Sequence, residues 1–287
     1  MHGRTLPPPG RADSGARAYL LLVTWRSTSA VLLLAAGLSG CDAFRVHPYA
    51  VPQDEWLQDL TEKNLAKIAR IVPPETFTFA AFGDSQRWED EASYAVPSIN
   101  ADPDLLFAIH VGDIVEFGLG QEYVWLNEYY RDLKIPFVTV VGNHDLLGNG
   151  GTIYESVYGP RNYTFLFGRL KFVMLDSNSR EYVDEIVPDL AWLERELVPE
   201  PTWDRAIVVS HVPFDDNDFR RELEEPYKEI VQRHGNVILS LHGHDHEFRD
   251  EMVEELRTVQ TDKMENRNWT KITVGPEGVI EVRQVFF

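Results

Sequence analysis

The feature that most constrains this chain is a series of short apolar segments that each stop at a cluster of polar residues. The clusters read Gly-Asp-Ser-Gln, Gly-Asp, Gly-Asn-His-Asp, Ser-His and Gly-His-Asp-His in chain order. Patterns typical of helices separate most of the segments, for example over residues 121–133. Apolar strands that alternate with helices indicate an α/β protein, in which helices cover the faces of a sheet. We therefore predict an α/β fold with polar side chains at the strand ends, where such folds bind ligands.

The same patterns place the expected elements along the chain. Strands are expected over residues 76–82, 105–111, 136–141, 163–167, 170–175, 206–210 and 237–241, and helices over 54–72, 90–99, 121–133, 190–197 and 222–234. After His246 the pattern changes to strands alone, including 271–274 and 279–287, so the chain is expected to end as a strand meander. Because no repeat or second linker interrupts the pattern, residues 54–287 are predicted to form one domain.

The charge of the chain restricts its partners. Asp and Glu number 46 against 27 Lys and Arg, which gives a net charge of −19. Such an acidic surface repels phosphate backbones, so no nucleic-acid partner is expected. A phosphorylated substrate would therefore need a local positive centre.

Residues 1–40 have the features of a secretory signal. An apolar run over 30–38 leads into Leu-Ser-Gly-Cys at 38–41. A bilayer span takes about 20 residues, so this run is too short to cross a membrane but fits the apolar region of a signal peptide. The small residues before Cys41 resemble a bacterial lipobox, which implies cleavage there and lipidation of the thiol. We expect a signal peptide over 1–40 and a tether over 41–53, in an exported lipoprotein anchored on the periplasmic or extracytoplasmic face of a membrane.

The polar clusters offer oxygen and imidazole ligands. Four of the nine histidines lie in them: His144, His211, His244 and His246. A core role for all four is a poor explanation, because unpaired polar groups are costly to bury. Asp, Asn and His together suit divalent transition metals, and the single cysteine, Cys41, excludes a thiolate zinc cluster. The clusters therefore predict a metal site.

The order of the clusters resembles the calcineurin-like metallophosphoesterases. That family shows Asp-x-His, Gly-Asp, Gly-Asn-His-Asp/Glu, a lone His and Gly-His-x-His, each at a strand end, and the resemblance spans Phe77 to His246. It implies a four-layer α/β/β/α sandwich and a phosphoric ester hydrolase with two divalent metal ions. The implied reaction is hydrolysis of a phosphate ester by a hydroxide that both metals activate, with the help of a catalytic histidine.

The resemblance also assigns a role to individual residues. The implied metal ligands are Asp84, Gln86, Asp113, Asn143, His211, His244 and His246. Asp113 would bridge the metals, Asp84 and His246 would hold the first, and Asn143, His211 and His244 the second. His144 would be the catalytic histidine, and Asp145 would orient it. The metal charges would then supply the positive centre that a phosphate needs.

One position departs from the family pattern, because Gln86 stands where the family has histidine. An amide oxygen is a harder and weaker donor than imidazole, so the first site is expected to prefer Mn, Fe or Mg over Zn. Alternatively, Gln86 hydrogen-bonds only a water or the substrate. The sequence is compatible with both roles of Gln86, as a metal ligand and as a hydrogen-bond partner of water or substrate.

Two alternative functions use the same segments. Gly83-Asp84-Ser85 also resembles the opening of the GDSL esterases, with Ser85 as nucleophile, but no histidine here follows an Asp by three residues, as that family requires. A non-catalytic, metal-bound binding or scaffolding lipoprotein is the other alternative, and Gln86 would then be the sign of lost turnover. Neither the phosphate ester, nor the choice between monoester and diester, nor the oligomeric state follows from the sequence.

Overall fold

The structure, a computed structural model, describes residues 47–287. The predicted signal peptide over 1–40 and its Cys41 lie outside the described residues and stay predictions. Residues from Pro48 to Phe287 form a single compact unit. Within this part of the chain, no helix has the length and apolar character needed to cross a membrane.

The first of two sheets carries the N-terminal strands. Its order is β11-β10-β1-β2-β3. The strands are β1 (Phe77–Phe82), β2 (Leu105–His110), β3 (Phe137–Thr139), β10 (Asn268–Gly275) and β11 (Gly278–Phe286). β1, β2 and β3 run parallel to one another, so their carboxyl ends lie at one edge of the sheet. β10 pairs antiparallel with β1 and with β11.

The second sheet carries the middle of the chain. Its order is β4-β5-β6-β7-β9-β8. The strands are β4 (Tyr163–Phe167), β5 (Leu170–Leu175), β6 (Arg205–Ser210), β7 (Val237–His242), β8 (Arg249–Val253) and β9 (Leu256–Gln260). β5, β6, β7 and β9 are parallel, and the hairpin partners β4 and β8 run antiparallel at the two edges.

Helices complete the outer layers. The α-helices are α2 (Leu60–Ile68), α3 (Glu89–Asn100), α4 (Gly120–Tyr130), α5 (Gly150–Val157), α6 (Leu190–Leu197) and α7 (Arg221–Arg233). The short 3₁₀ turns are η2 (Glu55–Leu57), η3 (His144–Leu146), η4 (Ser179–Glu181) and η5 (Met264–Asn266).

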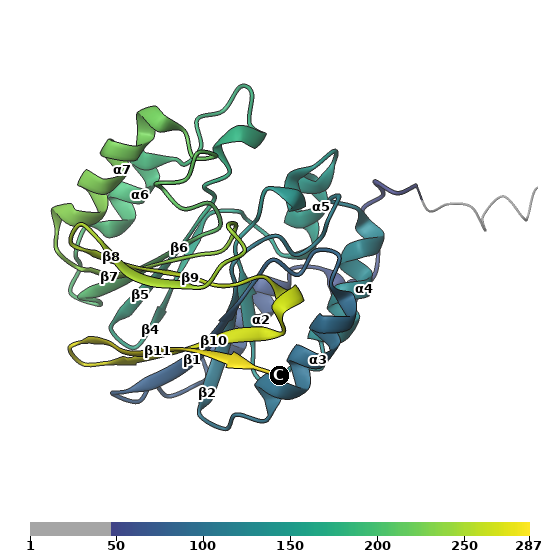
Figure 1. Cartoon of the computed structure of the whole chain (residues 1–287), viewed down its shortest axis with the longest axis horizontal. Coiled ribbons are helices and arrows are strands. Elements are labelled where there is room, and N and C mark those ends of the chain that lie inside the picture. The colour runs from purple at the N-terminus through teal and green to yellow at the C-terminus, as the bar shows by residue number, and fades with distance from the viewer. Residues whose placement is uncertain (1–46) are drawn as a thin grey trace, which may run out of the picture. The chain divides into compact units, whose positions relative to one another are not determined.

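Three buried clusters show how the layers stack. One cluster lies between the sheets, where the Phe172 ring of β5 meets the rings of Phe79 and Phe107 edge-on at centroid distances of 5.7 and 5.6 Å. A second cluster joins the first sheet to α3, α4 and α5, and a third joins the second sheet to α6 and α7. The arrangement, visible in Figure 1, is the predicted four-layer α/β/β/α sandwich.

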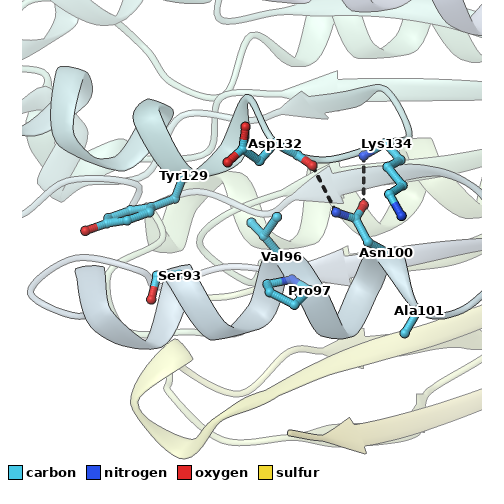
Figure 2. A pocket seen from close by; sticks show the side chains of 8 residues that line it. All are labelled: Ser93, Val96, Pro97, Asn100, Ala101, Tyr129, Asp132 and Lys134. Carbon is cyan, nitrogen blue, oxygen red and sulfur yellow. Dashed lines mark hydrogen bonds between the residues drawn. The ribbon is translucent and has the colours of Figure 1, made fainter.

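Side-chain hydrogen bonds fix α3 against the end of α4. The amide of Asn100 donates to the Asp132 carbonyl oxygen at 2.9 Å and accepts from the Lys134 backbone N–H at 2.7 Å (Figure 2). A pocket of about 400 Å³ lies between the two helices, and both Asp132 and Lys134 line it. It lies on the helical side of the first sheet and contains none of the predicted metal ligands.

The structure corrects two expectations about the elements. The predicted helix over 54–72 is broken at Asp59, whose left-handed φ of 51° separates η2 from α2, and Val72 is exposed beyond the end of α2. The predicted C-terminal meander is wrong, because β8 and β9 join the second sheet whereas β10 and β11 join the first. Local alternation identifies strands, but it carries no information about which sheet accepts them.

Candidate metal centre

The predicted site residues meet between the carboxyl ends of the two sheets. Asp84 follows β1, Asp113 follows β2, and Asn143 follows β3 in the first sheet. His211 directly follows β6, and His244 comes soon after β7 in the second sheet. Because each strand runs toward the same edge, the polar clusters that are far apart in sequence come together there.

The backbone at these positions is bent in an unusual way. Four of the predicted metal ligands have left-handed φ angles, namely Asp84 (50°), Asp113 (53°), His244 (80°) and His246 (61°). This conformation costs a non-glycine residue about 1–2 kcal/mol and concentrates at functional sites. The sharp turns aim consecutive side chains into one space at the expense of local backbone strain.

Glycine permits the close approach of the strand ends. A Cβ added at Gly142 would lie 2.0 Å from the Asp113 backbone nitrogen, which is closer than real Cβ atoms come to other heavy atoms. Gly112 has a φ of 97°, and an added Cβ would lie 2.6 Å from Nδ1 of His211. These glycines are therefore required by the packing of the site and not merely by turn formation.

Asp113 lies at the centre of the site. Its Oδ2 is 3.3 Å from Nε2 of His211 and 3.2 Å from Nε2 of Gln86, and its Oδ1 accepts from the His144 backbone N–H at 2.9 Å. Asp84, Asp113 and His211 are buried, and each offers a ligand atom within 4.8 Å of the others. Buried carboxylates at this spacing repel one another unless positive charge lies among them.

His211 supplies the clearest sign that a cation belongs here. Its Nδ1 donates to the Val111 carbonyl oxygen at 2.8 Å, so in the neutral ring Nε2 is an acceptor. That nitrogen nevertheless faces two more acceptors, Oδ1 of Asn143 at 3.1 Å and Oδ2 of Asp113 at 3.3 Å. Burial by itself lowers the pKa of His211, but the Asp113 carboxylate and its hydrogen bond raise that pKa to about 10. A divalent cation would take the place of the proton that His211 otherwise holds.

The same amide oxygen connects His211 to His244. Oδ1 of Asn143 is 3.1 Å from Nδ1 of His244, and the two imidazole rings lie edge-on at a centroid distance of 5.2 Å. The backbone N–H of His244 donates to Oδ1 of Asp84 at 3.1 Å, which fixes the turn after β7. Two nitrogens and one oxygen thus converge beside Asp113.

Gln86 and His246 face Asp84 and Asp113 from the other side. Nε2 of His246 is 3.4 Å from Oδ1 of Asp84 and 3.4 Å from Nε2 of Gln86. The amide oxygen of Gln86 is buried and has no hydrogen-bond partner among the described residues. Buried amide oxygens normally have a partner, so this atom fits a metal ligand that supplies oxygen. The donor set as a whole therefore fits divalent metals.

His144 projects from η3 toward the same space. Its Nδ1 donates to the Glu116 backbone carbonyl oxygen at 2.9 Å and lies 3.5 Å from the Glu116 carboxylate. Its Nε2 is 4.0 Å from Oδ2 of Asp113. Arg87 forms an ion pair with the same Glu116 carboxylate. Glu116 was not among the site residues predicted from the sequence, although an acidic residue three positions after Asp113, on the same loop, was a usable signal.

Asp145 lies behind the site and is buried. Its carboxylate accepts backbone N–H groups from Ile114 at 3.0 Å, Val115 at 3.1 Å and Gly142 at 2.8 Å. Burial, together with the charge of Asp113, raises the pKa of Asp145 to about 7. These hydrogen bonds tie the loop after β2 to the turn that carries His144, and the acidic residue beside the imidazole is Glu116.

The two remaining histidines of the strands are buried supports. His110 faces Oγ of Ser85 at 2.9 Å, and His242 lies between Oγ of Ser210 at 3.0 Å and Oγ of Ser240 at 2.8 Å. Burial lowers the pKa of both imidazoles to about 3, so both are neutral at physiological pH. Their contacts with serine hydroxyls hold the ends of β2 and β7 in place.

An open cavity and an acidic loop border the centre. The cavity has a volume of about 240 Å³ and is lined by Gln86, Arg87, Trp88, Glu116, His144, His246, Lys263 and Glu265. On the other side, carboxylates of Asp216 and Asp218 lie 3.6 and 3.5 Å from Nε2 of His244. A substrate could therefore approach the predicted metals from the cavity, beside His144.

Comparison with known proteins places this site in a known family. Residues 77–248 match the sequence profile of the family described as calcineurin-like phosphoesterase. A 3',5'-cyclic-nucleotide phosphodiesterase of Nostoc sp. (strain PCC 7120) is 28% identical over 156 residues, which cover 51% of this chain and 58% of that protein. The aligned region thus spans little more than half of that curated relative.

Solved structures share the fold. A dimetal phosphatase from Danio rerio superposes with a TM-score of 0.56 at 13% identity, covering 74% of this chain and 99% of the other. A purple acid phosphatase from yellow lupin (Lupinus luteus) superposes with a TM-score of 0.51 at 11% identity, covering 74% of this chain and 54% of the other. Since the profile match extends over most of the chain and includes every strand that ends at the site, the chain belongs to the calcineurin-like phosphoesterase family.

Proposed function

We propose that this protein hydrolyses phosphate esters at a centre of two divalent metal ions, with His144 as the catalytic histidine. The observation that carries the proposal is the meeting of side chains from five strand ends around Asp113, whose Oδ2 lies 3.2 Å from Gln86 and 3.3 Å from His211. Family membership supports the reaction class. The geometry supports the individual roles that follow.

The residues form two ligand groups that share Asp113. Asp84, Gln86 and His246 would hold one ion, and Asn143, His211 and His244 would hold the other. When bound, divalent ions polarise phosphoryl oxygens and lower the pKa of a coordinated water, which supplies a nucleophile near neutral pH. An amide oxygen from Gln86 favours Mn, Fe or Mg over Zn in the first group.

His144 is placed to serve the leaving group. Because its Nδ1–H is held by the Glu116 carbonyl oxygen, its Nε2 is the nitrogen that faces Asp113 and the cavity. A protonated Nε2 can donate its proton to the leaving oxygen of an ester in that cavity. Glu116 stabilises the charged imidazole at 3.5 Å, and Arg87 lies close enough to contact a phosphate at the rim.

The experiment combines metal analysis with turnover. Purified protein is analysed for bound metal and assayed with Mn²⁺ against an aryl phosphate monoester, an aryl phosphate diester and a 3',5'-cyclic nucleotide. The last is included because one relative is named a 3',5'-cyclic-nucleotide phosphodiesterase. We expect metal-dependent hydrolysis of at least one ester, since all three present a phosphoryl group.

Asp113→Asn tests the shared ligand. The substitution removes one negative charge from both ligand groups, so bound metal and activity should fall together. Asp132→Asn, at an exposed carboxyl between α3 and α4, is the matched control and should change neither. Full activity of Asp113→Asn would exclude the two-metal centre.

The same assays separate the alternative functions. A serine esterase would need an accessible Ser85, but its hydroxyl is fully buried and donates to the Ile114 carbonyl oxygen at 3.1 Å. A binding or scaffolding protein would retain metal without turnover of any ester. Hydrolysis by the wild type that stops on chelation and returns with Mn²⁺ would exclude both alternatives.

We also propose that the protein is exported and attached to a membrane through lipidated Cys41. The apolar run over 30–38 and the small residues before Cys41 support this assignment. Cys41→Ser should give an exported precursor that is neither lipidated nor cleaved, as measured by its mass and membrane fraction. Recovery of the wild-type protein from the cytosol would contradict the assignment.

A further inference from the structure

Most of the described Lys and Arg side chains that have no carboxylate partner belong to α2 or closely follow α2 or α4. Most Lys and Arg side chains of residues 47–287 lie within 4.0 Å of a carboxylate. Those that do not are Lys63, Lys67, Arg70, Arg131, Lys134, Arg195 and Arg221. The first five belong to α2, or follow α2 or α4 by at most four residues. In a chain with a net charge of −19, such a grouping is not expected from an even spread of charge.

Three of these cations line a pocket between α2 and the end of α4. The pocket has a volume of about 210 Å³ and is lined by Trp56, Leu60, Lys63, Asn64, Lys67, Asn127, Tyr130, Arg131, Leu133, Ile135 and Phe137. No Asp or Glu is among these lining residues. Cationic groups therefore stand at a pocket whose walls are largely apolar and aromatic.

Local contacts hold the three cations in place. The guanidinium carbon of Arg131 lies 5.0 Å from the centroid of the Trp56 ring. Nζ of Lys63 donates to the carbonyl oxygens of Glu55 at 2.7 Å and Gln58 at 2.5 Å, and Nζ of Lys67 donates to Oδ1 of Asn64 at 3.1 Å. These neutral partners orient the side chains and leave their charges uncompensated.

The neighbouring pockets differ in charge. Between α3 and α4, Lys134 shares its pocket with Asp132 (Figure 2). In the cavity beside the predicted metals, Arg87 pairs with Glu116, and Lys263 pairs with Glu265. The α2–α4 pocket shares no lining residue with that cavity, so its properties are independent of the metal centre.

We propose that the α2–α4 pocket binds a phosphate group that carries an apolar substituent. Three unpaired cations offer two or more charge-assisted hydrogen bonds to a dianion, and Trp56, Leu133 and Phe137 offer apolar contact to its substituent. The ligand is either a phosphate monoester in solution or the phosphomonoester headgroup of phosphatidic acid. Both sources present a phosphomonoester to the pocket.

Binding can be measured at Trp56 itself. The indole N–H of Trp56, assigned in ¹H–¹⁵N spectra from a Trp56→Phe sample, is followed while metal-loaded protein is titrated with inorganic phosphate and with butyl phosphate at constant ionic strength. A saturable shift is expected with both, and butyl phosphate should bind more tightly because of its alkyl chain. The proposal would be overturned if none of the three ligands, namely inorganic phosphate, butyl phosphate and the vesicles described below, gives a saturable shift.

Charge variants identify the pocket as the site. Lys67→Gln combined with Arg131→Gln should weaken phosphate binding at least about tenfold, because the double variant loses two charge-assisted hydrogen bonds to the anion. Arg221→Gln removes an unpaired cation of α7 and should leave the affinity unchanged. Equal affinities of the double variant and the wild type would contradict the assignment.

Two further arms separate the metal centre and the source of the phosphate. Asp113→Asn should keep the Trp56 response, so a failure of the proposed catalytic centre leaves this result unaffected. Binding to vesicles that contain phosphatidic acid but not to phosphatidylcholine vesicles, lost in the double variant, would assign the pocket to a lipid headgroup. Binding of butyl phosphate without selective vesicle binding would assign it to a soluble phosphate ester.

Discussion

One ring nitrogen of His144, Nδ1, is held by a hydrogen bond that it donates to the Glu116 carbonyl oxygen. The other ring nitrogen lies 4.0 Å from Oδ2 of Asp113, farther than Nε2 of His211 at 3.3 Å. His144→Ala should therefore keep most of the bound metal and lower kcat by about 10² to 10⁴, the range for loss of a general acid. Metal content and kcat are measured on the same preparation. A loss of metal as large as the loss of kcat would contradict the catalytic role.

Glu116→Gln is the companion variant for His144. It keeps the backbone carbonyl that holds Nδ1 but removes the carboxylate 3.5 Å from the imidazole. The neutral amide cannot form an ion pair with a charged imidazole, so kcat should fall while bound metal is kept. An unchanged kcat would show that Glu116 acts only through its backbone.

Variants of Gln86 can show whether this residue binds a metal ion or contacts the substrate. Gln86 is 4% exposed, and its amide nitrogen lies 3.2 Å from Oδ2 of Asp113 and 3.4 Å from Nε2 of His246, whereas its buried amide oxygen has no hydrogen-bond partner among the described residues. If it is a ligand, Gln86→Ala should need a higher Mn²⁺ concentration for half-maximal activity, and Gln86→His should shift preference toward Zn²⁺. Titration of each protein with Mn²⁺ and Zn²⁺ at saturating ester measures this. An unchanged Mn²⁺ requirement in Gln86→Ala, with a raised KM, would assign the residue to the substrate.

At the scale of elements, the loop after β3 is pressed against the loop after β2. A Cβ at Gly142 would lie 2.0 Å from the backbone nitrogen of Asp113 and 2.1 Å from its Oδ1. Gly142→Ala must push the two loops apart, so we expect about 1–3 kcal/mol of destabilisation and loss of bound metal. Thermal unfolding and metal analysis would measure both effects.

Gly151→Ala is the matched control for Gly142→Ala. Gly151 lies in α5, where the nearest atom to an added Cβ is the flexible Cδ2 of Leu146 at 3.3 Å. Alanine is the better helix former, so the free energy of unfolding should stay the same or rise by up to about 1 kcal/mol. Equal losses in both variants would mean that the close approach at Gly142 is not the cause.

At the scale of the whole molecule, the site depends on the contact between the sheets. Phe172 of β5 is fully buried against Phe79 and Phe107 of the other sheet. Phe172→Ala should cost about 3–5 kcal/mol of unfolding free energy, since it leaves a cavity between the sheets. Leu166→Ala, at a half-exposed position of the edge strand β4, should cost much less. Chemical denaturation would compare the two variants. Similar costs would contradict a shared inter-sheet core.

Local sequence was sufficient for most elements of the fold. The hairpin of β4 and β5 and the helix α6 have the bounds that were expected, because period-2 alternation and an amphipathic helix pattern are local properties. The sheet that each of the last four strands joins could not be predicted from local sequence. β9 and β10 follow one another in the chain, yet they pair in different sheets, and local alternation does not determine which strand becomes the neighbour.

The site shows the same division between sequence and tertiary structure. Polar clusters after apolar strands identified Asp84, Asp113 and the histidines as candidates, because the end of a strand and the ligand chemistry of a side chain are both local properties of the sequence. Their mutual distances, the orphaned oxygen of Gln86 and the position of Glu116 beside His144 arise from packing between loops of two sheets. The grouping of Lys63, Lys67 and Arg131 at one pocket likewise joins α2 to the end of α4, more than 60 residues apart. The residue types thus define the chemistry that the chain can carry. Which of these groups meet follows from the fold, because contacts between distant segments depend on the packing of whole layers.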